Sequence, residues 1–372
     1  MKILFITPFF YPVEGGVERH IYYLARELIK RNHEIVVFTS NLSRTGKINI
    51  KEEVHEGITI KRFNSWFKIG DFASFWPSLF NAVNKSNADI IHVHSYRHPH
   101  NLSVLFTNKP ALLTLHWPNY PKGLRKDYLD KIIPIFDKSL GKFLFDHYKI
   151  LCAVSQPEIE WIKSFDIDEN KIKLTPNGIP EEYLKKRNGK AFRKKYKLKH
   201  ELVILSLGRL HKSKGFDQII NVASNFVGVK FIIAGEGDYR KELEDLIKEK
   251  KVNNVILTGT LSEKEKLEAY ATCDLFLHPS HYEAFGIVVL EAMSQGKPVI
   301  VSDQGGLPWV AGDAGLVFKI NNSEDLKEKL MSLVKDVKLR KKLGLKAYNR
   351  AKKFTWNKIT ENLERIYKNA ES

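Results

Sequence analysis

The chain has 372 residues, which predicts two or three domains. Its apolar, aromatic and charged fractions of 43%, 11% and 28% are those of an ordinary globular protein and exclude a collagen, a fibre or a wholly disordered chain. No apolar run reaches the roughly 18–20 residues that a membrane span requires. The formal net charge is +17, and most of it lies in two segments, residues 181–200 and residues 335–358.

These two basic segments have two interpretations. They are either patches that face an anionic membrane or a nucleic acid, or a solvated linker and an exposed helix surface. Nucleic acid is the weakest of these partners, because neither segment interleaves aromatic residues with its charges as single-strand binding surfaces do. We therefore expect no nucleic acid partner and keep peripheral contact with an anionic membrane as a hypothesis.

Short apolar runs alternate with helical patterns along the chain, starting at residues 2–7. This first run leads straight into a loop with no small-residue cleavage site, so we predict a first strand and not a signal peptide. The predicted strands are 2–7, 34–39, 58–63, 89–94, 111–116 and 150–154, then 202–207, 229–235, 254–259, 274–279 and 298–302. Three helices follow at 322–334, 336–352 and about 356–370. Near-continuous apolar strands between helices indicate parallel sheets that are covered on both faces.

Two series of such strands predict an α/β fold with two doubly wound parallel-sheet domains, residues 1–175 and 176–355. The boundary falls in residues 173–190, which are rich in Pro, Gly and charge. Cys152 and Cys273 stand in apolar runs, so we expect buried thiols, no disulfide framework and a cytoplasmic protein. Because open parallel sheets bind ligands beyond the carboxyl ends of their strands, the residues after each strand are the candidate site.

Two loops that follow strands have residue types suited to phosphate. Gly15 and Gly16 stand where the first helix begins, and free N–H groups at a helix start favour phosphate, although a turn that needs positive φ would also explain them. In LGRLHKSKG, Gly208 and Arg209 follow a strand and Lys214 comes five residues later. An arginine fork and a lysine point charge can grip a diphosphate, and a solvated basic turn would have the same composition.

The segment HPSHYEAFGIVVLEAM places two carboxylates around a helix start. Glu283 precedes the helix that Phe285 and Gly286 open, and Glu291 lies about a turn and a half inside it. Glu283 is placed to bond sugar hydroxyls, and the helix start can meet a phosphate. Glu291 can accept two hydroxyl hydrogen bonds, as from a ribose. Its neighbours are apolar, so a buried carboxylate at this position needs partners.

The motifs GGVERH, TLHW, PNGI, GRLHKSKG, AGEG, DLFLHPS, EAFGIVVLE and GGLP occur in an order that resembles the retaining glycosyltransferases of family 4, from residue 3 to about residue 318. The resemblance implies the GT-B fold: two facing Rossmann-like domains, the acceptor mainly on the first, the nucleotide sugar mainly on the second, and the last helix packed back on the first. It implies transfer of a hexose from a UDP- or GDP-sugar to a hydroxyl of a glycan or lipid-linked acceptor, with retention at the anomeric carbon. No metal and no other cofactor is expected.

The resemblance also assigns roles to matching residues. Arg209 and Lys214 match the diphosphate-binding pair, Glu283 the acid that holds the donor sugar and Glu291 the ribose-binding acid. His116 matches a histidine near the reacting centre. The donor-binding backbone is matched by Gly15, Gly16, Gly208, Phe285, Gly286, Ile287 and Val288. The family often has Asp after this histidine, and here Trp117 stands in its place, so any acceptor recognition by that Asp is not carried over.

Other interpretations stay open. A nucleotide-sugar 2-epimerase-like isomerase has the same fold, and a non-catalytic, transferase-like subunit would keep much of the sequence. Asp166-Ile167-Asp168 has the spelling of a metal-binding Asp-x-Asp, but it lies between a helix and a strand, where Asp favours turns. The histidines of IHVHSYRHPH, at 92, 94, 98 and 100, either bind zinc or form a polar strand end at the acceptor side.

The aromatic stretch at residues 64–80 also has two interpretations. It contains Trp66, Phe67, Phe72, Phe75 and Trp76. These rings either admit a lipid-linked acceptor or touch a bilayer, or they pack a helix and a loop on the sheet. The first interpretation would place the protein peripherally on the cytoplasmic face of the membrane.

Overall fold

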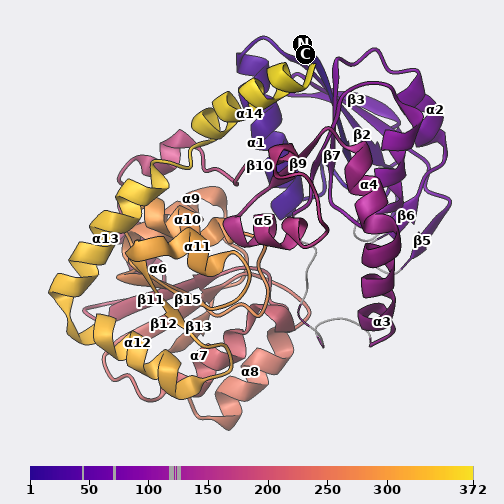
Figure 1. Ribbon diagram of the computed structural model, residues 1–372. Coiled ribbons are helices and arrows are strands. Elements are labelled where there is room, and N and C mark those ends of the chain that lie inside the picture. The colour runs from indigo at the N-terminus through magenta and orange to yellow at the C-terminus, as the bar shows by residue number, and fades with distance from the viewer. Residues whose placement is uncertain (44–45, 70–72, 117–120, 122, 124–126, 372) are drawn as a thin grey trace. The chain divides into compact units, whose positions relative to one another are not determined.

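The computed structural model describes residues 1–372 except 44–45, 70–72, 117–120, 122, 124–126 and 372 (Figure 1). The chain forms two compact units. Unit 1 consists of Met1–Gly178 together with Trp356–Ser372, and unit 2 consists of Ile179–Thr355. The division falls inside the Pro- and Gly-rich segment 173–190, a few residues after the boundary expected at 175–176.

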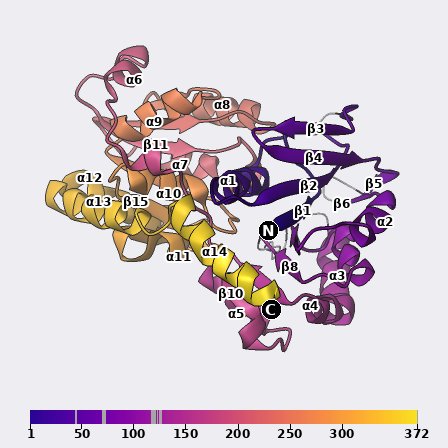
Figure 2. The same ribbon diagram turned by 90° about the horizontal axis from the view of Figure 1, so that it is seen from above.

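Unit 1 is built on an eight-stranded sheet in the order β10-β9-β8-β7-β1-β2-β4-β3, part of which is visible from above in Figure 2. Only β3, at the edge, runs antiparallel to its neighbour β4. The strands are β1 (Lys2–Thr7), β2 (Glu34–Ser40), β3 (Glu52–His55), β4 (Ile58–Phe63), β7 (Ile90–His94), β8 (Ala111–Thr114), β9 (Ile150–Ala153) and β10 (Ile172–Leu174). A separate hairpin joins β5 (Phe67–Ile69) and β6 (Ala73–Phe75).

Helices cover the two faces of this sheet, and α1 and α14 lie side by side (Figure 1). On α1, the buried residues Ile21, Leu24, Ala25 and Leu28 recur at the spacing of one helix face, so this stripe joins the core. The helices are α1 (Gly16–Lys30), α2 (Ser78–Asn84), α3 (Asp127–Phe136), α4 (Lys142–His147), α5 (Gln156–Lys163) and α14 (Trp356–Glu371). Shorter helical turns are η1 (Pro99–Phe106), η2 (Asp137–Gly141) and η3 (Glu169–Lys171).

Unit 2 contains a parallel six-stranded sheet in the order β13-β12-β11-β14-β15-β16. Its strands are β11 (Leu202–Leu207), β12 (Val229–Ala234), β13 (Val255–Leu257), β14 (Leu275–His278), β15 (Val299–Ser302) and β16 (Gly315–Phe318). The helices are α6 (Lys190–Lys195), α7 (Phe216–Ala223), α8 (Arg240–Glu249), α9 (Glu263–Thr272), α10 (Ile287–Ser294), α11 (Leu307–Ala311), α12 (Ser323–Lys335) and α13 (Val337–Ala351). The short turns η4 (Glu181–Leu184), η5 (Lys212–Lys214) and η6 (Gly312–Ala314) complete the unit.

The structure confirms the predicted α/β class with two Rossmann-like parallel sheets. All eleven predicted strands and the three C-terminal helices are present, each within a few residues of its expected ends. Cys152 and Cys273 are buried free thiols, and burial raises the pKa of each to about 12, so neither is a reactive thiolate. Among the described helices, none is both long enough and apolar enough to cross a bilayer.

Candidate functional site

Both sheets have a point at which the strand order reverses. In unit 2 the chain leaves β11 towards β12 on one side and later returns to β14 on the other, and in unit 1 β1 has β2 and β7 as its two neighbours. Loops diverge at the carboxyl ends of such strands, which leaves a crevice where doubly wound proteins bind ligands. In each unit the sequence-predicted site residues lie at or near this edge of the sheet.

In unit 2 the loops after β11 and β14 are joined by hydrogen bonds. The His281 amide donates to the Ser213 carbonyl at 2.8 Å, and Ser280 Oγ donates to the same oxygen at 3.1 Å. Gly215 has a φ of +65°, and a Cβ there would lie 2.1 Å from the Pro279 carbonyl oxygen. Only glycine allows this approach, because a side chain would collide with backbone that cannot move away. The approach brings the basic loop of β11 against the acidic loop of β14.

Lys214 and Glu283 meet at this junction. Lys214 Nζ donates to Glu283 Oε1, and the buried His278 Nε2, at the end of β14, donates to the same oxygen at 2.9 Å. Burial raises the pKa of Glu283, but the charge of Lys214 and the hydrogen bond from His278 outweigh it and lower the pKa to about 2. Glu283 is therefore a fixed anion, oriented by two donors, with its side chain 19% exposed.

The start of α10 follows Glu283 directly. Gly286 caps the helix with a φ of +93°, and a Cβ there would lie 2.6 Å from Leu307 Cδ2. The first N–H groups of an α-helix have no acceptor within the helix, so the amides at Gly286, Ile287 and Val288 form a site that favours an anion. Phe285 is buried and packs against the rings of Trp309 and Phe354, which fixes the backbone before the cap.

Glu291 is buried inside α10, and both of its oxygens have partners. Tyr270 Oη donates to Oε2 at 2.8 Å, and Lys266 Nζ donates to Oε1 at 3.3 Å. Lys266 is itself buried, and it also pairs with Glu263 at 3.0 Å. The prediction that a carboxylate among apolar neighbours needs partners is confirmed. Glu291 thus stabilises unit 2 in addition to any contact that it makes with a ribose.

Arg209 lies apart from the Lys214–Glu283 pair. It follows Gly208 at the end of β11, its side chain is 56% exposed, and its guanidinium is 3.9 Å from the carboxylate of Asp238. At that distance and exposure the attraction is weak, so the guanidinium can turn to a diphosphate at little cost.

In unit 1 the loop after β1 leads to α1, which begins at Gly16 with Gly15 as its N-cap. Gly15 is extended, with a φ of −172°, and a Cβ on Gly16 would meet no atom within 4 Å. Neither glycine has positive φ, so the alternative of a left-handed turn does not apply here. The two glycines instead leave the start of α1 without side chains, which lets a ligand approach the backbone closely.

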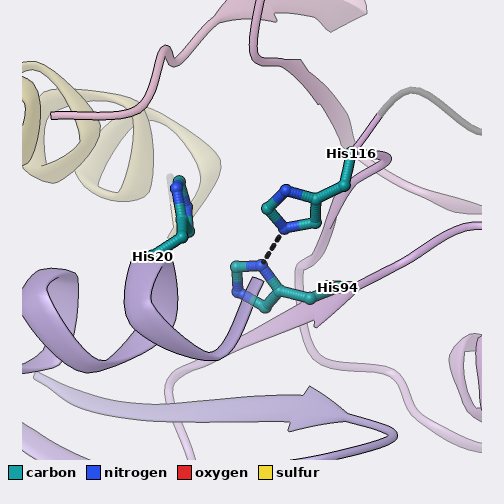
Figure 3. A group of neighbouring side chains, drawn as sticks. All are labelled: His20, His94 and His116. Carbon is teal, nitrogen blue, oxygen red and sulfur yellow. Dashed lines mark hydrogen bonds between the residues drawn. The ribbon is translucent and has the colours of Figure 1, made fainter. Parts of the chain in front are cut away.

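His116 follows β8 and lies in a cluster with His20 of α1 and His94 at the end of β7 (Figure 3). His94 Nδ1 and His116 Nε2 are 3.2 Å apart and share a hydrogen bond. His20 Nδ1 donates to the Asn177 side-chain oxygen at 2.7 Å, and its ring meets the edge of the His116 ring at a centroid distance of 4.9 Å. Burial is the largest cause that lowers the pKa of His20, to about 4, and that of His94 and His116 well below the ordinary value. All three imidazoles are neutral at physiological pH.

The other histidines of the 92–100 stretch have structural partners. His92 bonds Tyr367 Oη at 2.6 Å and Thr114 Oγ1 at 2.7 Å, and His100 Nε2 donates to the His94 carbonyl at 2.8 Å. In the described part of the chain, the group whose spacing could hold a metal is His20, His94 and His116, not the four histidines considered from the sequence.

Asp166 and Asp168 form a turn. Asp166 has a φ of +55°, and the Asp168 carboxylate accepts from the Asn170 amide at 2.9 Å. This short-range hydrogen bond is typical of Asp in turns, so the turn accounts for the Asp-x-Asp sequence pattern.

The aromatic stretch is divided between surface and core. Trp66 is 73% exposed and Phe67 51% exposed on the β5–β6 hairpin, whereas Trp76 is buried. Phe72, like Trp117, lies outside the described residues. Packing on the core therefore accounts for Trp76, and contact of Trp66 and Phe67 with an acceptor or a bilayer stays a prediction.

Sequence reasoning missed His20, Asn177, Lys266, Tyr270 and His278. His20 lies in the GGVERH motif and Asn177 in the PNGI motif. Both motifs were recognised in the sequence, but no role was assigned to these two residues. Lys266 and Tyr270 are four residues apart on α9, a spacing that puts them on one helix face. No local pattern linked that face to Glu291.

Comparisons with known proteins identify the family and the fold. The model described as Glycosyltransferase Family 4 matches residues 14–183, and the model described as Glycosyl transferases group 1 matches residues 188–350. Similar solved structures are glycosyltransferases of the GT-B fold. One of them, Alr3699/HepE of Anabaena in complex with UDP and glucose, has a TM-score of 0.77 and 19% identity, and the match covers 99% of this chain and 100% of that one.

The chain belongs to glycosyltransferase family 4. An uncharacterized glycosyltransferase of Methanocaldococcus jannaschii is 27% identical over 99% of this chain and 98% of its own length. The gpi3 subunit of phosphatidylinositol N-acetylglucosaminyltransferase from Schizosaccharomyces pombe is 26% identical over 97% of this chain and 79% of its own length. The resemblance noted in the sequence is confirmed, and the chain is a glycosyltransferase.

Proposed function

We propose that this glycosyltransferase moves a hexose from a nucleoside-diphosphate sugar to a hydroxyl group of a glycan or lipid-linked acceptor, with retention at the anomeric carbon. The observation that carries the proposal is the junction of the two loops in unit 2. There a fixed carboxylate, Glu283, and a cation, Lys214, lie directly before the N-terminus of α10. An anionic leaving group and a polyhydroxylated sugar need this combination of charges.

The residues of this junction divide the chemistry between them. The Lys214 ammonium has three N–H donors, and one of them holds Glu283, so the others are available to a diphosphate. The amides at the start of α10 meet charge that develops on the departing phosphate. Glu283 accepts hydrogen bonds from sugar hydroxyls, and its low pKa keeps it an acceptor throughout. The Anabaena structure with UDP and glucose is consistent with a uridine nucleotide as one donor to test.

Retention is proposed from the resemblance to the retaining family. The sequence motif places no second carboxylate beside Glu283 as a nucleophile, so a covalent glycosyl-enzyme intermediate is not part of the proposal. We propose attack from the face that the diphosphate leaves, with a phosphate oxygen taking the proton of the acceptor hydroxyl. The bond from the anomeric carbon to the phosphate oxygen breaks as the bond to the acceptor oxygen forms. The proton ends on the nucleoside diphosphate, so no metal and no further cofactor is needed in this proposal.

A lipid-linked acceptor would place the protein at a membrane surface. On α13 the exposed Lys338, Lys341 and Lys342 lie at helical spacing with Leu345, which is 64% exposed. Each surface lysine adds about 1 kcal/mol of attraction to anionic lipid, and an exposed apolar side chain adds burial. We propose peripheral contact with an anionic membrane through this face.

The test is incubation of the full chain with radiolabelled UDP- and GDP-sugars, with and without an extract of lipids and glycans. Label that moves to an acceptor, or slow release of free sugar, supports the transferase. Conversion of the nucleotide sugar into its epimer would identify the isomerase. Binding without any turnover would identify a non-catalytic subunit. Retention is read by NMR, as an axial or equatorial anomeric proton in the product compared with the donor.

A further inference from the structure

His94 and His116 come from neighbouring parallel strands whose ends lie side by side. In the register of β7 and β8, His94 lies opposite Thr114, two residues before His116. The two rings are stacked at a centroid distance of 5.4 Å with an angle of 27° between their planes. His116 has a φ of +58°, a region that residues with a side chain rarely adopt. With this left-handed backbone at His116, its ring lies against that of His94.

The hydrogen bond between these neutral rings can run in either direction, and the second nitrogen of His94 decides between them. His94 Nε2 is buried and has no partner in the part of the chain that the structure describes. If His116 were the donor, His94 would carry its proton on this Nε2, as a buried N–H without an acceptor. If His94 Nδ1–H is the donor, Nε2 has only an unused lone pair. Orphaned buried N–H groups are much rarer in proteins than unused acceptors, so the second arrangement is favoured.

From this bond we propose that His94 is a positioning residue, which donates from Nδ1 to His116 Nε2 and so keeps the proton of His116 on Nδ1. His116 then presents an N–H from Nδ1 to a reacting oxygen. The part of this inference that concerns the reaction rests on the proposed function and on the place near the reacting centre that the family resemblance implies for His116. The tautomer itself can be tested without any substrate.

His20 supports the same arrangement from α1. Its Nδ1–H is held by Asn177, and its ring packs edge-on against His116 with an angle of 87° between the planes. His20 also meets the His94 ring at 5.6 Å, so the three rings restrict one another. When packing fixes the orientation of an imidazole, the hydrogen bond on one ring nitrogen decides whether the other nitrogen carries the proton.

His94 Nε2, for which the described ranges of the chain offer no partner, also argues against a bound metal. The ligand nitrogens of His20, His94 and His116 all lie within 4.8 Å of one another, which a zinc ion could bridge after a small closure. Binding through His94 Nδ1 would put the remaining proton on Nε2, where the described residues offer no acceptor. Metal-binding histidines almost always have an acceptor for that second N–H. We therefore infer a metal-free, hydrogen-bonded pair.

The direct test is long-range ¹H–¹⁵N NMR of the full chain labelled with ¹⁵N-histidine, with His116 assigned through the His116→Gln variant. We expect the Nδ1–H tautomer at neutral pH. An Nε2–H tautomer would overturn the proposal, whether or not a transfer reaction has been found. One equivalent of zinc retained after desalting and lost with EDTA would overturn it as well.

Two substitutions at His94 separate positioning from packing. An asparagine amide places an N–H near the position of Nδ1, whereas leucine has similar bulk and no donor. We expect His94→Leu to lower kcat about tenfold, the rate equivalent of one hydrogen bond, with the donor KM changed less than twofold. His94→Asn should recover most of that loss. Equal kcat values for the two variants, with both folded by circular dichroism, would contradict the role of the donor.

Discussion

Acid should unfold unit 1 at a pH where most globular proteins are stable, because burial keeps six of its histidines neutral: His20, His92, His94, His98, His100 and His116. Burial is the largest cause that lowers the pKa of each. The pKa falls to about 4 for His20 and His98, to about 3 for His92 and His100, and well below the ordinary value for His94 and His116. Because the folded pKa lies below the unfolded pKa of 6.5, this stabilisation is complete above pH 6.5 and is lost as the pH falls towards the folded values.

The expected size follows from proton linkage. Each such histidine removes about 1.4 kcal/mol of unfolding free energy per pH unit below 6.5, so six remove roughly 8 kcal/mol per unit. A domain has about 5–15 kcal/mol in total. We therefore expect unit 1 to unfold at a pH between about 6 and about 4.5, and its stability at neutral pH sets where in this range it unfolds.

Urea titrations at a series of pH values measure this directly. Five of the six tryptophans belong to unit 1, and only Trp309 belongs to unit 2, so fluorescence reports mainly on unit 1. His100→Gln keeps a donor for the His94 carbonyl and removes one titrating group, so the free energy should fall less steeply, by about 1.4 kcal/mol per pH unit. The control is the exposed His147→Gln, which should follow the wild type. A free energy that stays constant from pH 6.5 to 4.5 would refute the reasoning.

Two further predictions follow from unit 2. Glu291→Ala leaves the buried Lys266 with the exposed carboxylate of Glu263 and the ring of Tyr183 as described partners. We expect a loss of about 3 kcal/mol, the lower end for a broken buried pair, seen as a fall of about 6–12 °C in the Tm of unit 2 by calorimetry. A higher donor KM without any fall in Tm would show that Glu291 acts only on the donor. If the α13 face binds membrane, the full chain should co-sediment with phosphatidylserine vesicles at low salt and separate at high salt, and replacing Lys338, Lys341 and Lys342 by Gln should weaken this without changing donor affinity. Wild-type protein that stays in the supernatant at low salt would rule out the contact.

The strands could be predicted because a parallel sheet buried on both faces needs continuous apolar runs, as in residues 2–7 and 202–207. The strands that were missed break this pattern. β3, of sequence EEVH, is an edge strand with one neighbour and is half exposed, so its sequence is polar. β16 also lies at a sheet edge and is short.

The candidate site was predictable where chemistry and local spacing coincide, and not where it depends on distant contacts. Glu283 and Lys214 were chosen from their loops, but their pairing requires the close approach at Gly215, which no local pattern contains. His94 was noted on its strand, while His20 stood in the GGVERH motif without an assigned role. Its proximity to His94 and His116 depends on how α1 packs on the sheet.

The central claim, that Glu283 acts on the donor sugar, is tested most directly by the turnover of Glu283→Gln with the best nucleotide sugar. The amide keeps the size of the side chain and removes the charge that faces Lys214 and His278. We expect kcat to fall about 10²–10³-fold, as for the loss of one preorganised polar contact, while the nucleoside diphosphate alone still binds. The exposed Glu324→Gln is the matched control and should keep full activity. Wild-type turnover by Glu283→Gln would contradict the account.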